Sequence, residues 1–218
     1  MFIPEQIGMR LNKMLVIGIT GGVGAGKSLC LQTLKEHCNC KITLADDVGN
    51  KVKEPGEKCY FQIVDLLGED ILLEDKTINK LKMAEKIFAD PKLLTKVNEI
   101  IHPAVEEYIL NDISRERNLG SIDVYFLEAA LLIEAGYVPY LDELWYIYTK
   151  ESVRIKRLKE SRSYSDEKIM QIMKQQLSEE EFRNHADFVL DNSYDFESTY
   201  KQLADKCRHL GIWIDKEL

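Results

Sequence analysis

MLVIGITGGVGAGKS, residues 14–28, decides the fold of this chain. The first half of the stretch is an unbroken apolar run, which is typical of a strand buried on both faces of a parallel sheet. The second half, residues 21–28, matches the pattern G-x-x-x-x-G-K-[ST], which wraps backbone N–H groups around phosphate oxygens. At average residue usage this pattern occurs by chance in about one chain in a hundred of this length. The stretch therefore predicts a strand, a phosphate-binding loop and a helix in direct succession.

Each residue type of the loop has a defined task at a nucleotide. The glycines let the backbone approach phosphate closely, and the N-terminus of the following helix adds partial positive charge. Lys27 supplies a charge for the β- and γ-phosphates, and Ser28 offers a hydroxyl ligand to Mg²⁺. We therefore expect ATP and Mg²⁺ as cofactors, with Ser28 as the metal ligand. The expected nucleotide site consists of Gly21, Gly22, Val23, Gly24, Ala25, Gly26, Lys27, Ser28 and Leu29.

Apolar runs alternate with amphipathic stretches along the whole chain, which is the pattern of a parallel sheet covered by helices. A helix is expected at residues 27–37, directly after the loop. Five runs predict strands, at residues 14–20, 41–45, 122–127, 143–149 and 188–190. The expected fold is therefore α/β, a three-layer P-loop NTPase architecture around a five-stranded parallel sheet, with residues 14–218 forming one domain.

The stretch between the second and third expected strands is too long for one crossover helix. Its periodicity predicts a helical insertion over about residues 55–120, with helices at residues 58–67, 79–88 and 91–117. Pro103 should end one helix and begin another, because proline lacks the N–H that a helix interior needs. A second helical region is expected at residues 152–185.

The composition disfavours several classes of protein. A net charge of −8 argues against wholesale binding to nucleic acid or anionic membranes. No apolar run reaches the length of a membrane span. The cysteines are odd in number and irregularly spaced, which is typical of reduced thiols in a cytoplasmic protein. Residues 1–13 are short and polar, and we expect them to form an N-terminal tail. The oligomeric state has no signal in the sequence.

Acidic residues follow two of the expected strands. Asp46 ends the second strand, and the carboxyl ends of neighbouring parallel strands face one crevice. Its carboxylate is therefore a candidate to accept the proton of an incoming hydroxyl, although Asp also commonly caps the next helix and Asp47 competes for either role. Glu128 ends the third strand, where it could support Mg²⁺ or activate water.

Basic residues gather after the fourth expected strand. Arg154 and Arg157 share one helix face, and Arg162 follows them. These arginines form either a lid that stabilises charge on a transferring phosphoryl group or a solvated basic face balanced by the acidic residues 178–181. His102, before Pro103, is either a substrate contact or a cap or packing residue at the expected helix junction.

The loop by itself leaves several activities open. Guanine specificity usually comes with an N-K-x-D element, and residues 50–53 (NKVK) lack the aspartate, which disfavours a GTPase. The alternatives are then a kinase acting on a small molecule or a nucleotide, and an ATP-binding regulatory module.

Five motifs follow one another along the chain from residue 14. They are ITGGVGAGKS (residues 19–28), Ala45-Asp46 with Glu54-Pro55-Gly56, Ile101-His102-Pro103, Leu131-Leu132-Ile133-Glu134, and Ala186-Asp187 with Asp191-Asn192. In this order and register they resemble the dephospho-CoA kinase family. The resemblance implies a P-loop kinase that transfers the γ-phosphoryl group of ATP to the ribose 3′-hydroxyl of dephospho-CoA, the last step of coenzyme A biosynthesis.

The resemblance also implies roles for individual residues. Asp46 takes the position of the catalytic base, and the other implied catalytic residues are Lys27, Arg157 and Arg162, with a lid at about residues 157–170. The implied substrate-binding residues are Asp46, Lys80 and His102, and Lys80 stands where the family usually has arginine. The chain departs from the family pattern at Leu44, at Ala130 and in the spacing of Arg157 and Arg162.

Overall fold

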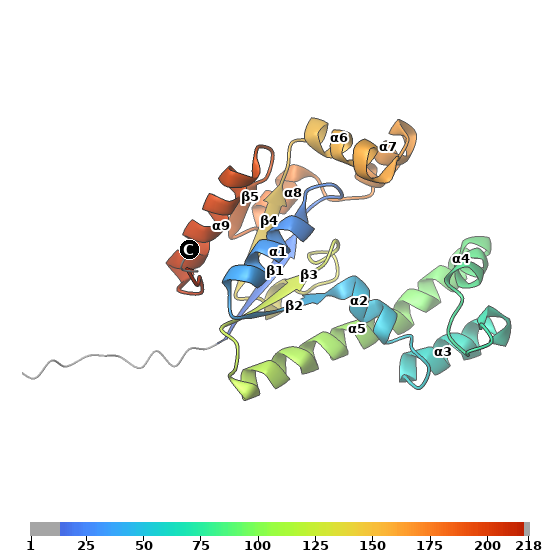
Figure 1. The fold of residues 1–218 in the computed structure, drawn as a ribbon. Helices are drawn as coiled ribbons and strands as arrows, with labels where there is room; N and C mark the ends of the chain where they lie inside the picture. Colours follow the sequence, from blue (N-terminus) through green and yellow to red (C-terminus); the bar gives the residue numbers. More distant parts are fainter. Residues whose placement is uncertain (1–13, 216–218) are drawn as a thin grey trace, which may run out of the picture.

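One parallel sheet forms the centre of the computed structural model, which describes residues 14–215; the expected tail at residues 1–13 lies outside the described residues. The strands are β1 (Leu15–Thr20), β2 (Cys40–Leu44), β3 (Val124–Glu128), β4 (Glu143–Tyr148) and β5 (Phe188–Asp191). They pair in the order β2-β3-β1-β4-β5, and every pair is parallel (Figure 1). The predicted five-stranded parallel sheet is confirmed, with β1 at its centre.

Helices connect the strands, and none in residues 14–215 is long and apolar enough to cross a lipid bilayer. The helices are α1 (Lys27–His37), α2 (Ala45–Lys51), α3 (Lys58–Leu67), α4 (Lys80–Ala89), α5 (Pro91–Leu119), α6 (Glu151–Arg162), α7 (Asp166–Lys174), α8 (Glu179–His185) and α9 (Phe196–Leu210), with short 3₁₀ turns η1 (Glu69–Ile71) and η2 (Val138–Tyr140).

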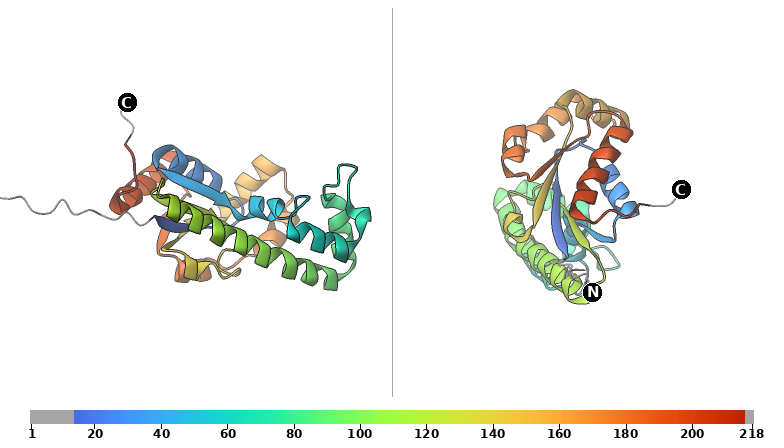
Figure 2. Two further views of the ribbon diagram at one scale, coloured as in Figure 1. Left: turned by 90° about the horizontal axis from the view of Figure 1, so that it is seen from below. Right: turned by 90° about the vertical axis from the view of Figure 1, so that its left-hand side faces the viewer.

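The sheet is covered on both faces, which gives the predicted three layers (Figure 2). Successive residues of a strand point to opposite faces, so Ile17 and Ile19 of β1 pack with Leu34 of α1 and Leu203 of α9. On the other face Tyr146 of β4 stacks on Phe182 of α8, with ring centroids 4.7 Å apart. α1 and α9 therefore form one outer layer, and α8 belongs to the other.

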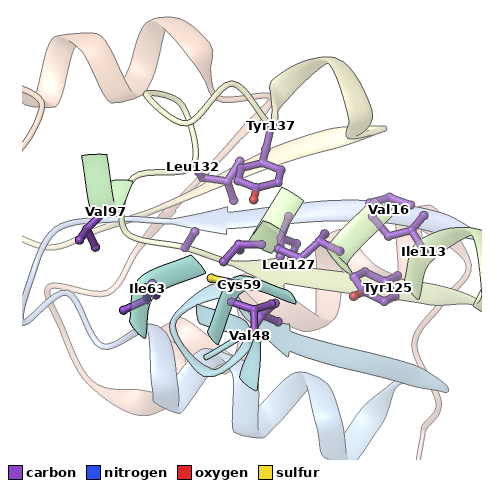
Figure 3. Packing of buried hydrophobic residues seen from close by; sticks show 14 of the residues in the cluster. Val16, Val48, Cys59, Ile63, Val97, Ile113, Tyr125, Leu127, Leu132 and Tyr137 are labelled. Carbon is purple, nitrogen blue, oxygen red and sulfur yellow. The ribbon is translucent and has the colours of Figure 1, made fainter. Parts of the chain in front are cut away.

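The second face also carries the helical insertion. Val16, Tyr125 and Leu127 of the sheet share one buried cluster with Ile113 of α5 and Val48 of α2 (Figure 3). The same cluster continues away from the sheet between the helices of the insertion, where it contains Cys59, Ile63, Val97, Ile71 and Met83. The insertion is thus joined to the core by continuous apolar packing, with α3 and α4 at the far end of α5 (Figure 1).

α5 is a single helix of 29 residues with Pro103 in its interior, so the expected break at this proline is wrong. A proline inside a helix costs about 3 kcal/mol. Val97, before the proline, and Val105 and Ile109, after it, are buried in the same cluster. Burial of one such side chain stabilises the fold by about 1.5–3 kcal/mol, and together the three outweigh the missing hydrogen bond. Tertiary packing keeps the helix continuous.

Most of the other boundaries agree with the sequence pattern. The strands begin and end within two residues of the predicted positions, and the helices α1 and α3 have the predicted bounds. α4 begins after Asn79, whose side chain accepts hydrogen bonds from the N–H groups of Leu81 and Lys82. α2 and α9 were not predicted. α2 buries only Val48, so it carries no hydrophobic periodicity that a sequence pattern could show.

Candidate active site

The phosphate loop lies between β1 and α1, as predicted. Gly26 precedes the first turn of α1 with φ of 90°, a conformation that favours glycine. A Cβ at this position would lie 2.2 Å from Nδ2 of Asn192, so the loop has no room for a side chain there. The sequence pattern that demands glycine thus has two physical causes at this position, backbone conformation and close packing.

Side chains from distant parts of the chain hold the carbonyl groups of the loop. Ala25 O accepts hydrogen bonds from Asn192 Nδ2 at 2.7 Å and from Thr149 Oγ1 at 2.9 Å. Val23 O accepts from Arg154 Nε at 2.9 Å. Asn192 and Thr149 are both buried, so these bonds are shielded from competing water. The loop is therefore fixed by the ends of β4 and β5 and by α6 in the protein alone.

Two of the arginines on α6 reach the loop. Arg154 donates to Val23 O and, from NH2, to Gln176 Oε1 at 2.9 Å. The same Gln176 oxygen accepts a hydrogen bond from the Val23 N–H at 3.1 Å. Arg157 NH2 donates to Asn192 O at 3.0 Å, and its NH1 donates to Ala25 O of the loop at 3.5 Å. The shared face predicted for Arg154 and Arg157 therefore lies against the loop. Arg162 is exposed at the end of α6, with its guanidinium 5.9 Å from the centre of the Tyr164 ring.

Lys27 lies against the loop and the end of β3. Its Nζ donates to Gly21 O at 2.8 Å and lies 3.3 Å from Oε1 of Glu128. Burial raises the pKa of Glu128, Lys27 opposes the rise, and the negative charges of Asp46 and Asp47 add to it. The three carboxylates and Lys27 therefore form one electrostatic group at the carboxyl ends of β2 and β3.

Asp46 lies in the first turn of α2, where an acidic side chain interacts favourably with the helix dipole. The alternative that Asp46 caps this helix is wrong, because the N-cap residue is Leu44 and it makes no side-chain capping bond. The helix begins two residues earlier than a capping role for Asp46 would require.

A cavity of about 550 Å³ is lined by α2, α5 and the segment after β3; we call it the α2–α5 cavity. Asp46 and Lys53 line it from the α2 side, His102 from α5, and Ala130 from the segment after β3. The structure thus brings the predicted residues Asp46 and His102 to one cavity. His102 is exposed and lies within α5, so the expected helix junction does not exist.

A smaller cavity of about 210 Å³ adjoins it, lined by Lys80. Asn50 and Lys53 line both cavities, which connects Lys80 to the α2–α5 cavity. On the opposite side of α2, a groove of about 630 Å³ is lined by Ser28, Asp47 and Glu128. Two carboxylates that are adjacent in the sequence therefore line different spaces. Asp46 lines the cavity, and Asp47 lines the groove.

Sequence reasoning missed several contacts that shape the site. Gln176 and Thr149 were not candidates, and Arg154 was considered only as a lid or surface arginine and not as a partner of the loop. All three contact the loop over more than 100 positions of sequence. Lys53 had no local signal. Asn192 stood in a motif with no assigned role, and the structure shows that it packs against Gly26 and donates to Ala25 O.

Comparison with known proteins shows the family. A model of the family described as dephospho-CoA kinase matches residues 15–198. The chain belongs to the dephospho-CoA kinase family. The dephospho-CoA kinase of Listeria innocua is 36% identical over 187 residues, which cover 86% of this chain and 92% of that protein. The one from Oceanobacillus iheyensis is 34% identical over 198 residues, covering 91% and 98%.

Solved structures share the fold. A protein from Thermus thermophilus superposes with a TM-score of 0.73 at 24% identity, covering 90% of this chain and 98% of that one. Dephospho-CoA kinase from Campylobacter jejuni superposes with a TM-score of 0.70 at 19% identity, covering 89% and 96%. The predicted P-loop kinase fold is confirmed. Membership of the family makes the chain an ATP-dependent kinase, a transferase.

Proposed function

We propose that this protein transfers the γ-phosphoryl group of ATP to the ribose 3′-hydroxyl of dephospho-CoA, with Asp46 as the base. The observation that carries the proposal is the position of Asp46. On one side, the charge of Asp46 acts on Glu128, which pairs with Lys27 of the phosphate loop. On the other side, Asp46 lines the α2–α5 cavity. A carboxylate between a bound nucleotide and a cavity can accept the proton of a hydroxyl that attacks phosphorus.

The donor ATP would bind the loop Gly21–Leu29 at the N-terminus of α1. Backbone N–H groups and the helix dipole favour anions there, and the Lys27 ammonium already lies against the loop at Gly21 O. Arg157, which contacts the loop end of β5 through Asn192 O, would stabilise charge on the transferring group. We assign the lid to α6 and α7, about residues 157–170, which would carry Arg162 towards the phosphates on closure.

The residues present fit Mg²⁺. Ser28, Asp47 and Glu128 line one groove and offer the hard oxygen donors that this ion takes. No three His, Cys, Asp or Glu side chains within residues 14–215 gather into a site of their own, which suits an ion that binds mainly through substrate phosphates and water. Bound there with Ser28 as its protein ligand, Mg²⁺ would neutralise charge on the phosphates.

The α2–α5 cavity would hold the acceptor. Asp46 would orient the 3′-hydroxyl and take its proton, while His102 and Lys80 would contact the rest of the molecule from α5 and α4. Closure of the lid would exclude water, which otherwise competes with the acceptor for the phosphoryl group. The absence of a membrane-spanning helix in residues 14–215 is compatible with the cytoplasmic location that we propose.

Asp46→Asn tests the base. We expect kcat for phosphorylation of dephospho-CoA to fall by about 10²–10⁴-fold, the contribution of a positioned base, with the Kd for ATP unchanged in equilibrium binding. Asp65→Asn, an exposed carboxylate on α3, is the matched control and should keep full activity. Unchanged kcat in Asp46→Asn would refute the base assignment.

The identity of the acceptor is tested directly with the unmodified protein. ADP release is measured with ATP, Mg²⁺ and either dephospho-CoA or a panel of nucleoside monophosphates, and the product is identified by mass. Transfer to dephospho-CoA supports the proposal. Transfer only to a nucleoside monophosphate would show a different kinase of the same fold, and ATP binding without any transfer would show a regulatory module.

A further inference from the structure

Lys53 has an unusual position for a lysine. It follows α2, is half-buried, and lines both the α2–α5 cavity and the smaller cavity beside it. Its backbone N–H donates to Asn50 O at 3.1 Å, but its side chain forms no hydrogen bond and no ion pair among residues 14–215. An ammonium group taken partly out of water without a partner carries a desolvation cost that native proteins usually offset with an opposite charge.

Its strongest electrostatic neighbour is a second cation. Burial lowers the pKa of Lys53, and the positive charge of Lys80 lowers it further, while Cys59 and Asp46 act in the opposite direction. Lys80, at the start of α4, likewise makes no ion pair within the described part of the chain. Glu54 lines the smaller cavity as well, but it pairs with neither lysine. Two unpaired cations therefore converge on one space.

The two lysines come from different parts of the fold, so their proximity is a result of tertiary packing. Packing that holds two positive charges close together costs stability. Lys53 precedes the turn at Pro55 and Gly56, whereas Lys80 begins α4 after the Asn79 cap. Like charges held close together destabilise the fold unless a ligand compensates them. A half-buried lysine can also lie along apolar surface with its charge in water, but that arrangement does not require a second lysine at the same cavity.

The geometry relative to Asp46 indicates which anion would compensate them. Asp46 and Lys53 line one cavity, and the negative charge of Asp46 acts on the ammonium of Lys53. Dephospho-CoA carries its diphosphate on the 5′-carbon of the same ribose whose 3′-hydroxyl is phosphorylated. An acceptor with its hydroxyl at Asp46 therefore presents its diphosphate a few ångströms further along the same cavity.

We propose that Lys53, together with Lys80, binds the diphosphate of the acceptor and so selects dephospho-CoA over nucleosides that lack this group. The inference rests on the proposed function, because it takes Asp46 as the site of the reacting hydroxyl. Lys53 is a specificity-determining residue in this scheme. It contributes to binding of a part of the substrate that does not react, and its loss should change KM more than kcat.

Steady-state kinetics of Lys53→Met test the proposal, since methionine keeps much of the apolar stem and removes the charge. We expect the KM for dephospho-CoA to rise by at least about tenfold, the usual loss for a charged hydrogen bond, with kcat and the KM for ATP within threefold of wild type. Lys53→Arg keeps the charge and should restore most of the affinity. Thermal unfolding of each variant is followed by circular dichroism, so that a folding defect is recognised as such.

Lys58→Met is the matched control. Lys58, five residues later at the start of α3, is exposed and lines neither the α2–α5 cavity nor the smaller cavity beside it. Its removal should leave the KM for dephospho-CoA unchanged. An unchanged KM in Lys53→Met, or an Arg variant as impaired as the Met variant, would overturn the assignment while wild-type turnover still supported the proposed function. Absence of wild-type turnover would refute the proposed function itself.

Discussion

The molecule has two halves around its proposed site, the side of the phosphate loop and the side of the α2–α5 cavity. A comparison of Lys27 in the first with Lys53 in the second shows how they differ. Lys27, beside the phosphate loop, already has a carbonyl at 2.8 Å and a carboxylate at 3.3 Å in the protein alone. Lys53, beside the α2–α5 cavity, has neither. The loop side is held by hydrogen bonds to backbone carbonyls, and the α2–α5 side is held by apolar packing along α5. The half that we propose for the donor is thus preorganised, whereas the half that we propose for the acceptor keeps the charge of Lys53 available.

The difference follows from what each half must bind. A triphosphate needs many backbone N–H groups in fixed positions, and such an array is stable only if the loop carbonyls are satisfied elsewhere. An acceptor of mixed character needs apolar walls and a few charges. One polar network does support the acceptor half: Lys41 of β2 lies 2.7 Å from Asp112 of α5, and Tyr125 of β3 donates to the same carboxylate at 2.9 Å.

Substitution of Lys27 should have the largest effect on activity. We expect Lys27→Met to lower kcat/KM by about 10³-fold or more, because a charge aimed at the transferring phosphoryl group acts mainly in the transition state. Lys35→Met, further along α1 and exposed, is the control and should keep its activity. A loss smaller than tenfold in a folded Lys27→Met protein would contradict a role for this ammonium in transfer.

Asp112 tests the polar network that holds α5 on the sheet. Asp112→Asn removes the charge of a carboxylate that is only 4% exposed and that Lys41 and Tyr125 contact, while Lys41 keeps Glu116 at 2.9 Å. We therefore expect a loss of about 1.5–3 kcal/mol of unfolding free energy, the usual contribution of a hydrogen bond to a charged group. Chemical denaturation measures this loss. Asp205→Asn, an exposed carboxylate on α9, should change the unfolding free energy by less than about 0.5 kcal/mol.

The same variant gives a dependence on pH. Burial raises the pKa of Asp112, but hydrogen bonds from Lys41 and Tyr125 outweigh it, so the pKa lies below its ordinary value. A depressed folded-state pKa means that the stabilisation is complete above about pH 4, the unfolded-state pKa, and is lost as the pH falls through the folded-state pKa. The difference between wild type and Asp112→Asn should therefore shrink on acidification; a constant difference would contradict an ionised Asp112.

Gly26 and Gly56 provide a pair of substitutions, one in each half. Both have positive φ, 90° and 101°, but a Cβ on Gly26 would meet Asn192 at 2.2 Å, whereas one on Gly56 has no atom within 4 Å. Gly56→Ala should cost about 1–2 kcal/mol of unfolding free energy from backbone strain alone. Gly26→Ala should cost about 2–4 kcal/mol, because it also displaces the buried Asn192 amide. Equal costs would show that packing around the loop is loose.

The sequence predicts the loop and the sheet better than it predicts α5 and the partners of the loop. The loop pattern and the apolar strand runs depend on neighbours along the chain, so the strand and helix on either side of the loop and the sheet could be predicted. Pro103 was mispredicted because its local preference is overridden by burial of Val97 and Val105 on either side. The partners of the loop depend on the third dimension. Arg154 and Arg162 carry the same charge on one helix, and only the packing of α6 shows that the first touches Val23 O and the second faces Tyr164.

Substitution of Arg154 should have the smallest effect of those considered, and it concerns the KM for ATP. Its guanidinium bonds Val23 O and Gln176, so Arg154→Met should loosen the loop before ATP arrives without removing a group aimed at the reacting phosphate. We expect the KM for ATP to rise by about tenfold, equivalent to about 1.4 kcal/mol, with the KM for the acceptor unchanged. Lys156→Met is the control, because Lys156 faces solvent two residues away and makes only a surface pair at 3.9 Å with Glu160. Equal KM values for ATP in the two variants would mean that the loop keeps its shape without Arg154, and the donor half would then owe its order to Asn192 and Thr149.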